Sequence, residues 1–349
     1  MKKIKTIIVD DSAVIRELFS EMLADNATIE VVATAEDPYD AREKIKRYNP
    51  DVITLDVEMP KMDGISFLEK IMTLRPMPVV MISSLTTKGA DITLRALELG
   101  AADYIAKPES IDEHGYKRLK ESLIHKIKCA ANVRTNSINS STTNEALRYT
   151  GLPAAHLIAI GASTGGVEAL RDVLKCLPAN IPPVVITQHM PEIFTATFAK
   201  RMDNLAAPSV WEAKNKQKIE PGNVYIAPGN HHLAVKMQGS ELYCQVFHGE
   251  AVSGHQPSVD VLFNSVSKIT GKKMVGVILT GMGHDGANGL LKMRTAGART
   301  IGQSEASCVV YGMPKAAREI GAVEQEITLA DIPKRILQLC ATQGDRYAV

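Results

Sequence analysis

The chain has 349 residues, of which 45% are hydrophobic and 23% charged, a composition typical of a soluble globular protein of about two domains. Its net charge of +1 argues against binding to nucleic acid or to an anionic membrane surface. No apolar run is long enough to span a bilayer, and the first one stops at Asp10, too early for a signal peptide. The five cysteines are scattered and form no C-x-x-C pair, which favours reduced thiols and a cytoplasmic location.

The first 130 residues alternate between strand-like and helix-like patterns. Five short apolar runs are typical of buried strands: 4–9, 30–35, 52–55, 79–82 and 103–106. Each run is followed by a stretch with helical spacing: 13–24, 39–48, 65–74, 88–99 and 117–128. Ser12 precedes the first of these stretches and is its expected N-cap. Five such repeats predict a doubly wound α/β domain over residues 1–130, with a parallel sheet between two layers of helices.

Polar side chains follow the C-terminal ends of these predicted strands: Asp10, Asp11, Asp56, Ser83 and Lys107. In an open parallel sheet those ends share one crevice, so three carboxylates converge there. A cation relieves their repulsion, and oxygen-only ligands favour a hard ion such as Mg²⁺. Since Lys107 adds a positive charge and Ser83 a hydroxyl, the pattern predicts a site for a transferred phosphoryl group, with one carboxylate as the nucleophile.

The same residues, with Tyr104 and the segment Leu55–Gly64 (LDVEMPKMDG), resemble the receiver domain of response regulators. The resemblance covers residues 1 to about 125 and implies a flavodoxin-like fold. It also implies phosphorylation of Asp56 by a chemotaxis histidine kinase.

Two sets of site residues are implied by this resemblance. The Mg²⁺ ion is expected near four groups: the carboxylates of Asp10, Asp11 and Asp56 and the backbone carbonyl of Glu58. The phosphoryl group is expected to be sensed by three switch residues: Ser83, Tyr104 and Lys107.

A polar stretch separates the first domain from the rest of the chain. Residues 136–144 read NSINSSTTN, with almost no apolar content, so a flexible linker is expected over residues 131–151. A second domain is expected over residues 152–349.

The second domain opens with a strand, a tight turn and a helix start. The apolar run His156–Ala162 ends at Ser163, and a helical pattern begins after Gly165 and Gly166. Gly161, Ser163 and Gly165 match the G-x-S-x-G nucleophile elbow. Taken alone, such a turn is more often a phosphate-binding loop or a simple change of chain direction than a nucleophile elbow.

Two further strand-like runs of this domain also end in reactive residues. Residues 183–187 precede Gln188-His189, and residues 274–279 precede a glycine-rich segment that contains Met282 and Asp285. In a parallel sheet, Ser163, His189 and Asp285 therefore lie over one crevice, where the imidazole takes the serine proton and the carboxylate orients the imidazole. Backbone amides near Met282 are expected to stabilise the oxyanion of a tetrahedral intermediate.

The complete set of motifs resembles the family of chemotaxis response-regulator protein-glutamate methylesterases. The matching segments are GASTGG at 161–166, QHMP at 188–191, YIAP at 225–228, HQPSVDVLF at 255–263 and GMGHDG at 281–286. The resemblance implies a mainly parallel α/β esterase domain with a Ser163, His189 and Asp285 triad and with the Met282 amide as oxyanion donor. It implies glutamate γ-methyl esters of methyl-accepting chemoreceptors as substrates, deamidation of receptor glutamines, activation by phosphorylation, and no cofactor in the esterase site.

Two other functions are open to a receiver domain with a second domain. A transcriptional output domain would be basic and helix-rich, unlike the α/β pattern here. A nucleotide-binding module would need a G-x-G-x-x-G or P-loop spacing, which residues 161–166 lack.

Asn230-His231-His232 has no evident third metal ligand and is interpreted as a structural loop. Residues 254–260 have no spacing that indicates a chemistry, and we expect them at the rim of the crevice.

Overall fold

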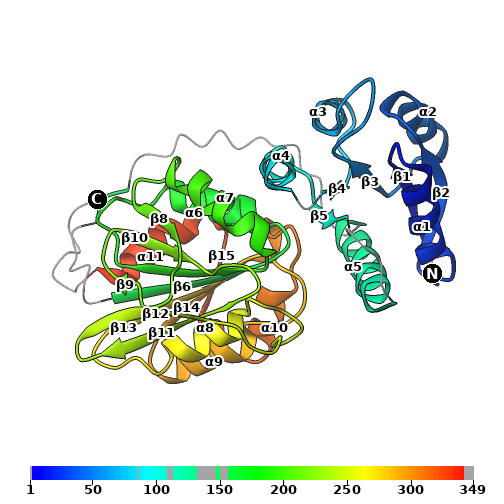
Figure 1. Ribbon diagram of the computed structural model, residues 1–349. Coiled ribbons are helices and arrows are strands. Elements are labelled where there is room, and N and C mark those ends of the chain that lie inside the picture. The colour runs from blue at the N-terminus through cyan, green and yellow to red at the C-terminus, as the bar shows by residue number, and fades with distance from the viewer. Residues whose placement is uncertain (1, 85, 108–112, 132–146, 150–155, 342–349) are drawn as a thin grey trace. The chain divides into compact units, whose positions relative to one another are not determined.

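The structure is a computed structural model, and it describes residues 2–84, 86–107, 113–131, 147–149 and 156–341 (Figure 1). The chain divides into two compact units, residues 1–141 and 142–349. Most of the expected linker, 131–151, lies outside the described residues, so its flexibility and the domain bounds at 130 and 152 stay predictions. Among the described residues, no helix is both long and apolar enough to cross a membrane.

The first unit is a five-stranded parallel sheet between helices. Its strands are β1 (Ile4–Val9), β2 (Ile29–Ala35), β3 (Val52–Asp56), β4 (Val79–Ser83) and β5 (Asp103–Ala106). Its helices are α1 (Ala13–Ala24), α2 (Pro38–Tyr48), α3 (Gly64–Leu74), α4 (Thr87–Glu98) and α5 (Glu113–Ala131). The strand order β2-β1-β3-β4-β5 is that of a flavodoxin-like fold and confirms the predicted doubly wound architecture.

Helix caps in the first unit follow the sequence closely. The Ser12 hydroxyl accepts a hydrogen bond from the Ile15 amide at 3.4 Å, which confirms the predicted N-cap of α1. Asp37 and Asp63 cap α2 and α3 in the same way. Each cap supplies an acceptor to backbone amides that a helix start leaves without partners, and this stabilises the first turn of the helix.

The second unit contains a seven-stranded parallel sheet. Its strands are β6 (His156–Ala162), β7 (Val184–Gln188), β8 (Ser209–Glu212), β10 (Asn223–Ile226), β13 (Lys273–Ile278), β14 (Arg299–Gln303) and β15 (Gln325–Ile327). Their order is β15-β14-β13-β6-β7-β10-β8, which confirms the predicted mainly parallel sheet. The chain leaves β6 toward β7 on one side and later returns to β13 on the other, so the strand order reverses beside β6.

Helices cover both faces of this sheet. They are α6 (Gly166–Lys175), α7 (Glu192–Asp203), α8 (Val259–Val266), α9 (Ala287–Thr295), α10 (Met313–Glu319) and α11 (Ile332–Cys340). Helices α6, α7 and α11 lie on one face, and α8, α9 and α10 on the other (Figure 1). Two short 3-10 helices, Glu305–Ser307 and Leu329–Asp331, lie between β14 and α10 and between β15 and α11.

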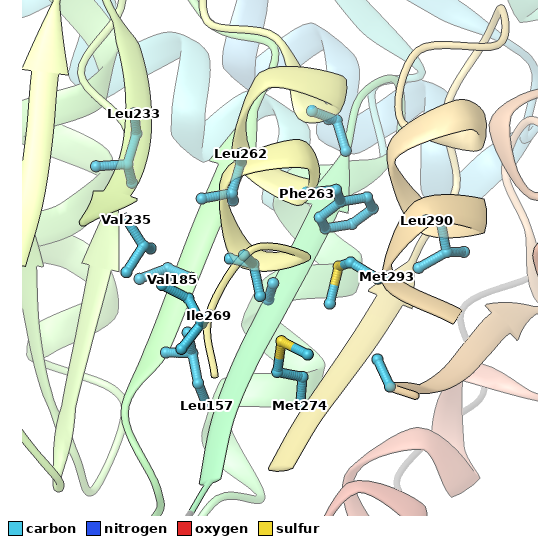
Figure 2. Packing of buried hydrophobic residues seen from close by; sticks show 14 of the residues in the cluster. Leu157, Val185, Leu233, Val235, Leu262, Phe263, Ile269, Met274, Leu290 and Met293 are labelled. Atoms are coloured by element: carbon cyan, nitrogen blue, oxygen red, sulfur yellow. The ribbon is translucent and has the colours of Figure 1, made fainter. Parts of the chain in front are cut away.

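A small antiparallel sheet, absent from the sequence-based expectations, packs beside α8. It is formed by β9 (Lys218–Ile219), β11 (His232–Gln238) and β12 (Glu241–Phe247), in the order β11-β12-β9. Leu233 and Val235 of β11 join Leu262 and Phe263 of α8 in one buried cluster (Figure 2). Because α8 is held between two sheets, the position of its first turn is closely defined.

Gly161 shows how tightly β6 packs against α8. A Cβ on Gly161 would lie 2.2 Å from Val259 Cγ1 and 3.2 Å from Phe263 Cζ. We expect Gly161→Ala to lower the free energy of unfolding by about 1–3 kcal/mol through overpacking. The measurement is urea unfolding of the full chain.

The matched control for this prediction is the double variant Gly161→Ala/Val259→Ala, which removes the clashing methyl groups. Its destabilisation should be smaller than the sum of the two single changes by about 0.5–3 kcal/mol. Strict additivity would show that the contact between Gly161 and Val259 does not limit the packing.

Candidate active site

The predicted phosphoryl site of the first unit is assembled at the ends of β1, β3 and β5. Asp10, Asp11 and Asp56 each offer one carboxylate oxygen, and these oxygens lie within 4.8 Å of one another. The Lys107 Nζ atom lies 2.8 Å from Asp56 Oδ2 and 3.0 Å from Asp10 Oδ2. The strand order reverses between β1 and β3, which is where ligands bind in open parallel sheets.

Burial and charge oppose each other at this site. Burial raises the pKa of Asp56 to about 6, although its hydrogen bond with Lys107 acts in the opposite sense. Burial disfavours the charge of Lys107, but its contacts with Asp56 and Asp10 outweigh burial and raise the pKa of the ammonium group. One ammonium group therefore faces a cluster of three carboxylates.

The oxygen donors of this cluster suit a hard divalent cation. Three converging carboxylates and no soft ligand match the preference of Mg²⁺. The Glu58 amide lies 3.4 Å from Asp56 Oδ1, which places Glu58 next to the cluster. Its carbonyl as a ligand stays a prediction.

Two predicted switch residues, Ser83 and Tyr104, lie on neighbouring strands β4 and β5, and the third, Lys107, directly follows β5. Ser83 is fully buried, and its Oγ lies 2.6 Å from Thr93 Oγ1 of α4. Tyr104 is buried too, and burial raises the pKa of its phenol well above the usual value. The Lys126 Nζ atom lies 4.7 Å from the centre of the Tyr104 ring. Their role as switch residues stays a prediction.

In the second unit, Ser163 occupies a tight turn between β6 and α6. Its amide donates to the Thr280 carbonyl at 3.0 Å, and its carbonyl accepts from the Gly166 amide at 2.7 Å. Gly165 has a φ of +75°, and a Cβ there would lie 2.5 Å from Val309 Cβ. The turn therefore needs glycine for both its backbone conformation and the available space.

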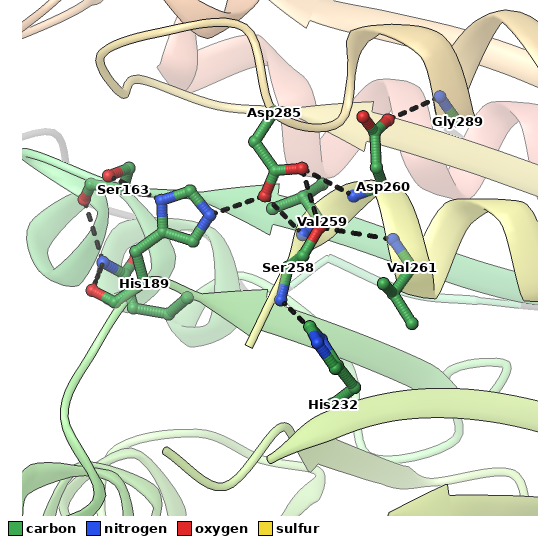
Figure 3. Close-up of polar contacts among 10 residues, drawn as sticks. Ser163, His189, His232, Ser258, Val259, Asp260, Val261, Asp285 and Gly289 are labelled. Atoms are coloured by element: carbon green, nitrogen blue, oxygen red, sulfur yellow. Dashed lines mark hydrogen bonds and ion pairs between the residues drawn. The ribbon is translucent and has the colours of Figure 1, made fainter. Parts of the chain in front are cut away.

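Ser163, His189 and Asp285 are brought together from the ends of β6, β7 and β13 (Figure 3). His189 Nδ1 lies 3.0 Å from Ser163 Oγ, and His189 Nε2 lies 2.8 Å from Asp285 Oδ2. Because a carboxylate only accepts, Nε2 carries the proton, and Nδ1 of the neutral ring is the acceptor that faces the serine hydroxyl. The two ring nitrogens are thus used in the opposite sense from the chymotrypsin arrangement.

The Asp285 carboxylate is almost fully buried and accepts four hydrogen bonds. Besides His189, its donors are the Ser258 hydroxyl at 2.8 Å, the Val259 amide at 2.7 Å and the Asp260 amide at 3.1 Å (Figure 3). Burial alone would raise the pKa of Asp285, but the hydrogen bonds outweigh it and hold this pKa below the usual value. Asp285 is therefore an anion at neutral pH.

The backbone around Met282 is held close to Ser163. The Gly281 carbonyl accepts from the Gly312 amide at 3.1 Å and the Met313 amide at 2.7 Å, and a Cβ on Gly281 would lie 2.7 Å from Ser163 Cβ. In a trans peptide the N–H points away from the carbonyl, so the Met282 amide faces away from these donors. Among the described residues, the Met282 amide has no hydrogen-bond acceptor.

Two residues that contact the triad, His255 and Ser258, were assigned no catalytic or binding role from the sequence. The His255 ring stacks on the His189 ring, with centroids 3.7 Å apart and an interplanar angle of 11°. Ser258 caps α8 and donates to Asp285. A serine before an apolar run is typical of a helix N-cap, a signal that could have marked Ser258, but no local pattern connects it with a carboxylate 27 residues away.

Comparisons with known proteins agree with both units. The response regulator receiver domain family matches residues 6–115, and the CheB methylesterase family matches residues 158–336. A protein-glutamate methylesterase/protein-glutamine glutaminase of Caulobacter vibrioides is 54% identical to the chain, covering 98% of it and 100% of its own length. The Salmonella typhimurium protein of that name is 49% identical, over 97% of each chain. The crystal structure of the Thermotoga maritima CheB methylesterase catalytic domain is also similar, with a TM-score of 0.51 and 36% sequence identity. The match covers 52% of this chain and 97% of that domain.

The network around Asp285 makes a prediction about hydrolysis. Asp285→Asn removes the anion that fixes the protonated nitrogen of His189, so we expect ester turnover to fall by about 10⁴-fold. The measurement is the steady-state rate for a methyl ester substrate.

Asp260→Asn is the matched control, because Asp260 is a second buried carboxylate at the start of α8 whose Oδ1 accepts from the Gly289 amide at 2.6 Å. Asparagine keeps that acceptor, so most of the activity should remain. Equal losses in the two variants would show that Asp285 acts only through the packing of α8.

Proposed function

The chain belongs to the CheB methylesterase family, and we propose that Ser163, His189 and Asp285 form the catalytic triad of its esterase domain. The enzyme is a hydrolase, a protein-glutamate methylesterase and protein-glutamine glutaminase of the response-regulator type. The observation that carries the triad is the continuous path of contacts from the Ser163 hydroxyl through His189 to the buried Asp285 anion. These contacts supply an activated nucleophile and a general base.

The chemistry follows from the polarity of these groups. His189 Nδ1 takes the Ser163 proton as Oγ attacks the γ-carbonyl of a methylated glutamate, and Asp285 stabilises the imidazolium. The Met282 amide is our proposed donor to the oxyanion of the tetrahedral intermediate. Collapse of the intermediate passes the proton from His189 to the leaving oxygen, which releases methanol and leaves an acyl-Ser163 ester. Water then repeats these steps and yields the glutamate carboxylate; a glutamine substrate releases ammonia instead.

The first unit is proposed to control this reaction through Asp56. Asp56 is the proposed phosphoacceptor, because its carboxylate lies among the other acidic groups and within 2.8 Å of Lys107. When bound, Mg²⁺ would supply positive charge to the phosphoryl oxygens; its proposed ligands are Asp10, Asp11, Asp56 and the Glu58 carbonyl. Lys107 would neutralise a further oxygen, while Ser83 and Tyr104 would respond to the new group as switch residues.

The partners follow from the two activities. We propose a chemotaxis histidine kinase as the phosphodonor and methyl-accepting chemoreceptors as the substrates, acted on in the cytoplasm. The alternative outputs, DNA binding and nucleotide binding, are not favoured, since the second unit matches a methylesterase family. That nucleic acid is no partner and that the esterase site needs no cofactor stay predictions.

Removal of the nucleophile tests the triad. Ser163→Ala leaves no hydroxyl to form the acyl-enzyme, so we expect methanol release from methylated receptor to fall by roughly 10⁴- to 10⁶-fold. Ser267→Ala is the control, because Ser267 caps the C-terminal end of α8 and its hydroxyl donates to the Asn264 carbonyl. Near-normal turnover by a folded Ser163→Ala protein would eliminate the proposed triad.

Phosphorylation makes a separate prediction. Acetyl phosphate with Mg²⁺ should add one phosphoryl group to the wild-type chain and raise its rate of methanol release. Asp56→Ala should be neither labelled nor stimulated, whereas Asp25→Asn, an exposed position after α1, should behave as wild type. Intact-mass measurement and the methanol assay report these two results, and equal labelling of Asp56→Ala would refute the assignment.

A further inference from the structure

His232 is a fully buried histidine with a defined protonation state. Its Nε2 lies 2.9 Å from the Glu250 carbonyl, and its Nδ1 lies 3.2 Å from the Ser258 amide nitrogen. A carbonyl only accepts and an amide only donates, so the ring is neutral, with its proton on Nε2. Both of its partners are backbone groups, and they lie at the two ends of the segment 250–258.

The segment 250–258 contacts the triad at two places. Within it, Val252 and His255 exchange two backbone hydrogen bonds at 3.0 and 3.1 Å, which close a tight turn. His255 is the last residue of this turn, and its ring stacks on the His189 ring with centroids 3.7 Å apart. Ser258, the last residue of the segment, donates its hydroxyl to Asp285 at 2.8 Å. One segment therefore covers the base and holds the carboxylate.

We propose that His232 is a positioning residue of the esterase site. Its Nε2 donates to the Glu250 carbonyl and holds the ring, and its Nδ1 accepts from the Ser258 amide, so that the Ser258 hydroxyl stays in place to donate to Asp285. In Figure 3 the His232 ring is joined by a hydrogen bond to the Ser258 amide and not to a triad side chain, so it is proposed to act through the Ser258 backbone. This inference rests on the proposed triad and adds to it a residue that the sequence analysis assigned to a structural loop.

The chemistry at Nδ1 distinguishes positioning from simple packing. The ring also packs against Phe247 with centroids 5.5 Å apart, a contact that any planar group of similar size would keep. The Ser258 amide is different, because it is buried and requires an acceptor at this position. If the acceptor is lost, the amide has to move toward another partner, and the Ser258 hydroxyl moves with it. A shift of about 1 Å at such a site can cost on the order of 100-fold in rate.

Two substitutions separate the two nitrogens of His232. His232→Asn keeps an acceptor oxygen near the position of Nδ1 and loses the donor to Glu250, whereas His232→Gln keeps a donor near Nε2 and loses the acceptor for Ser258. We expect His232→Gln to lower kcat on the order of 10- to 100-fold without a change in KM. His232→Asn should stay within a few fold of wild type. Methanol release from methylated receptor gives both constants, using the full chain.

His231→Gln is the matched control. The His231 ring lies against the Gly229 carbonyl and the His248 ring, so its loss should leave kcat unchanged. Folding of every variant is checked by circular dichroism and thermal unfolding. Equal kcat values for folded His232→Asn and His232→Gln, whether both are normal or both reduced, would overturn the proposal.

A second measurement applies where His232→Gln does not fold. Amide hydrogen exchange at Ser258 should be slow in the wild type, and His232→Asn should keep both this protection and kcat. Rapid exchange in the wild type would overturn the proposal, as would a His232→Asn variant in which protection and kcat do not change together. These results do not test the proposed triad itself, which is tested separately by the turnover of Ser163→Ala.

Discussion

The proposed esterase site depends on the hydrogen bonds that the buried Asp285 carboxylate accepts. An anion that is 1% exposed is costly to bury unless it is well paired, and here four donors surround it. Three of these donors belong to Ser258 and to the next two residues, at the beginning of α8. The triad is therefore located by the start of one short helix, which the apolar cluster of Figure 2 holds between two sheets.

Both units place their chemistry at the same kind of topological position. In the first unit the strand order reverses between β1 and β3, and Asp10 and Asp56 lie at the ends of these strands. In the second unit it reverses beside β6, and Ser163 and Asp285 follow β6 and β13. The side chains at those ends then decide the reaction: carboxylates and a lysine suit a phosphoryl group, and a serine with an imidazole suits an acyl group.

Sequence patterns predicted which candidate site residues lie close together wherever such a residue follows a buried strand. Ser163, His189 and Asp285 could be brought together in advance, because parallel strands end at one edge of the sheet. The antiparallel sheet of β9, β11 and β12 was not foreseen: β11 and β12 form a local hairpin, and the two-residue strand β9 pairs with β12 from further back in the chain. The contacts of His232 with Ser258 and of His255 with His189 were missed, because they join segments 26 and 66 residues apart.

The direction of the serine–histidine–aspartate relay was equally beyond reach of the sequence, because it depends on which ring nitrogen meets which partner. His189 and His232 both carry their proton on Nε2, because that nitrogen faces an oxygen that can only accept a hydrogen bond. What differs is the group opposite Nδ1. His189 faces a hydroxyl, which can give up its proton when Oγ forms a bond, whereas His232 faces a backbone amide, which cannot. The same tautomer therefore suits His189 to its proposed role as a base and His232 to its proposed role as a positioning residue.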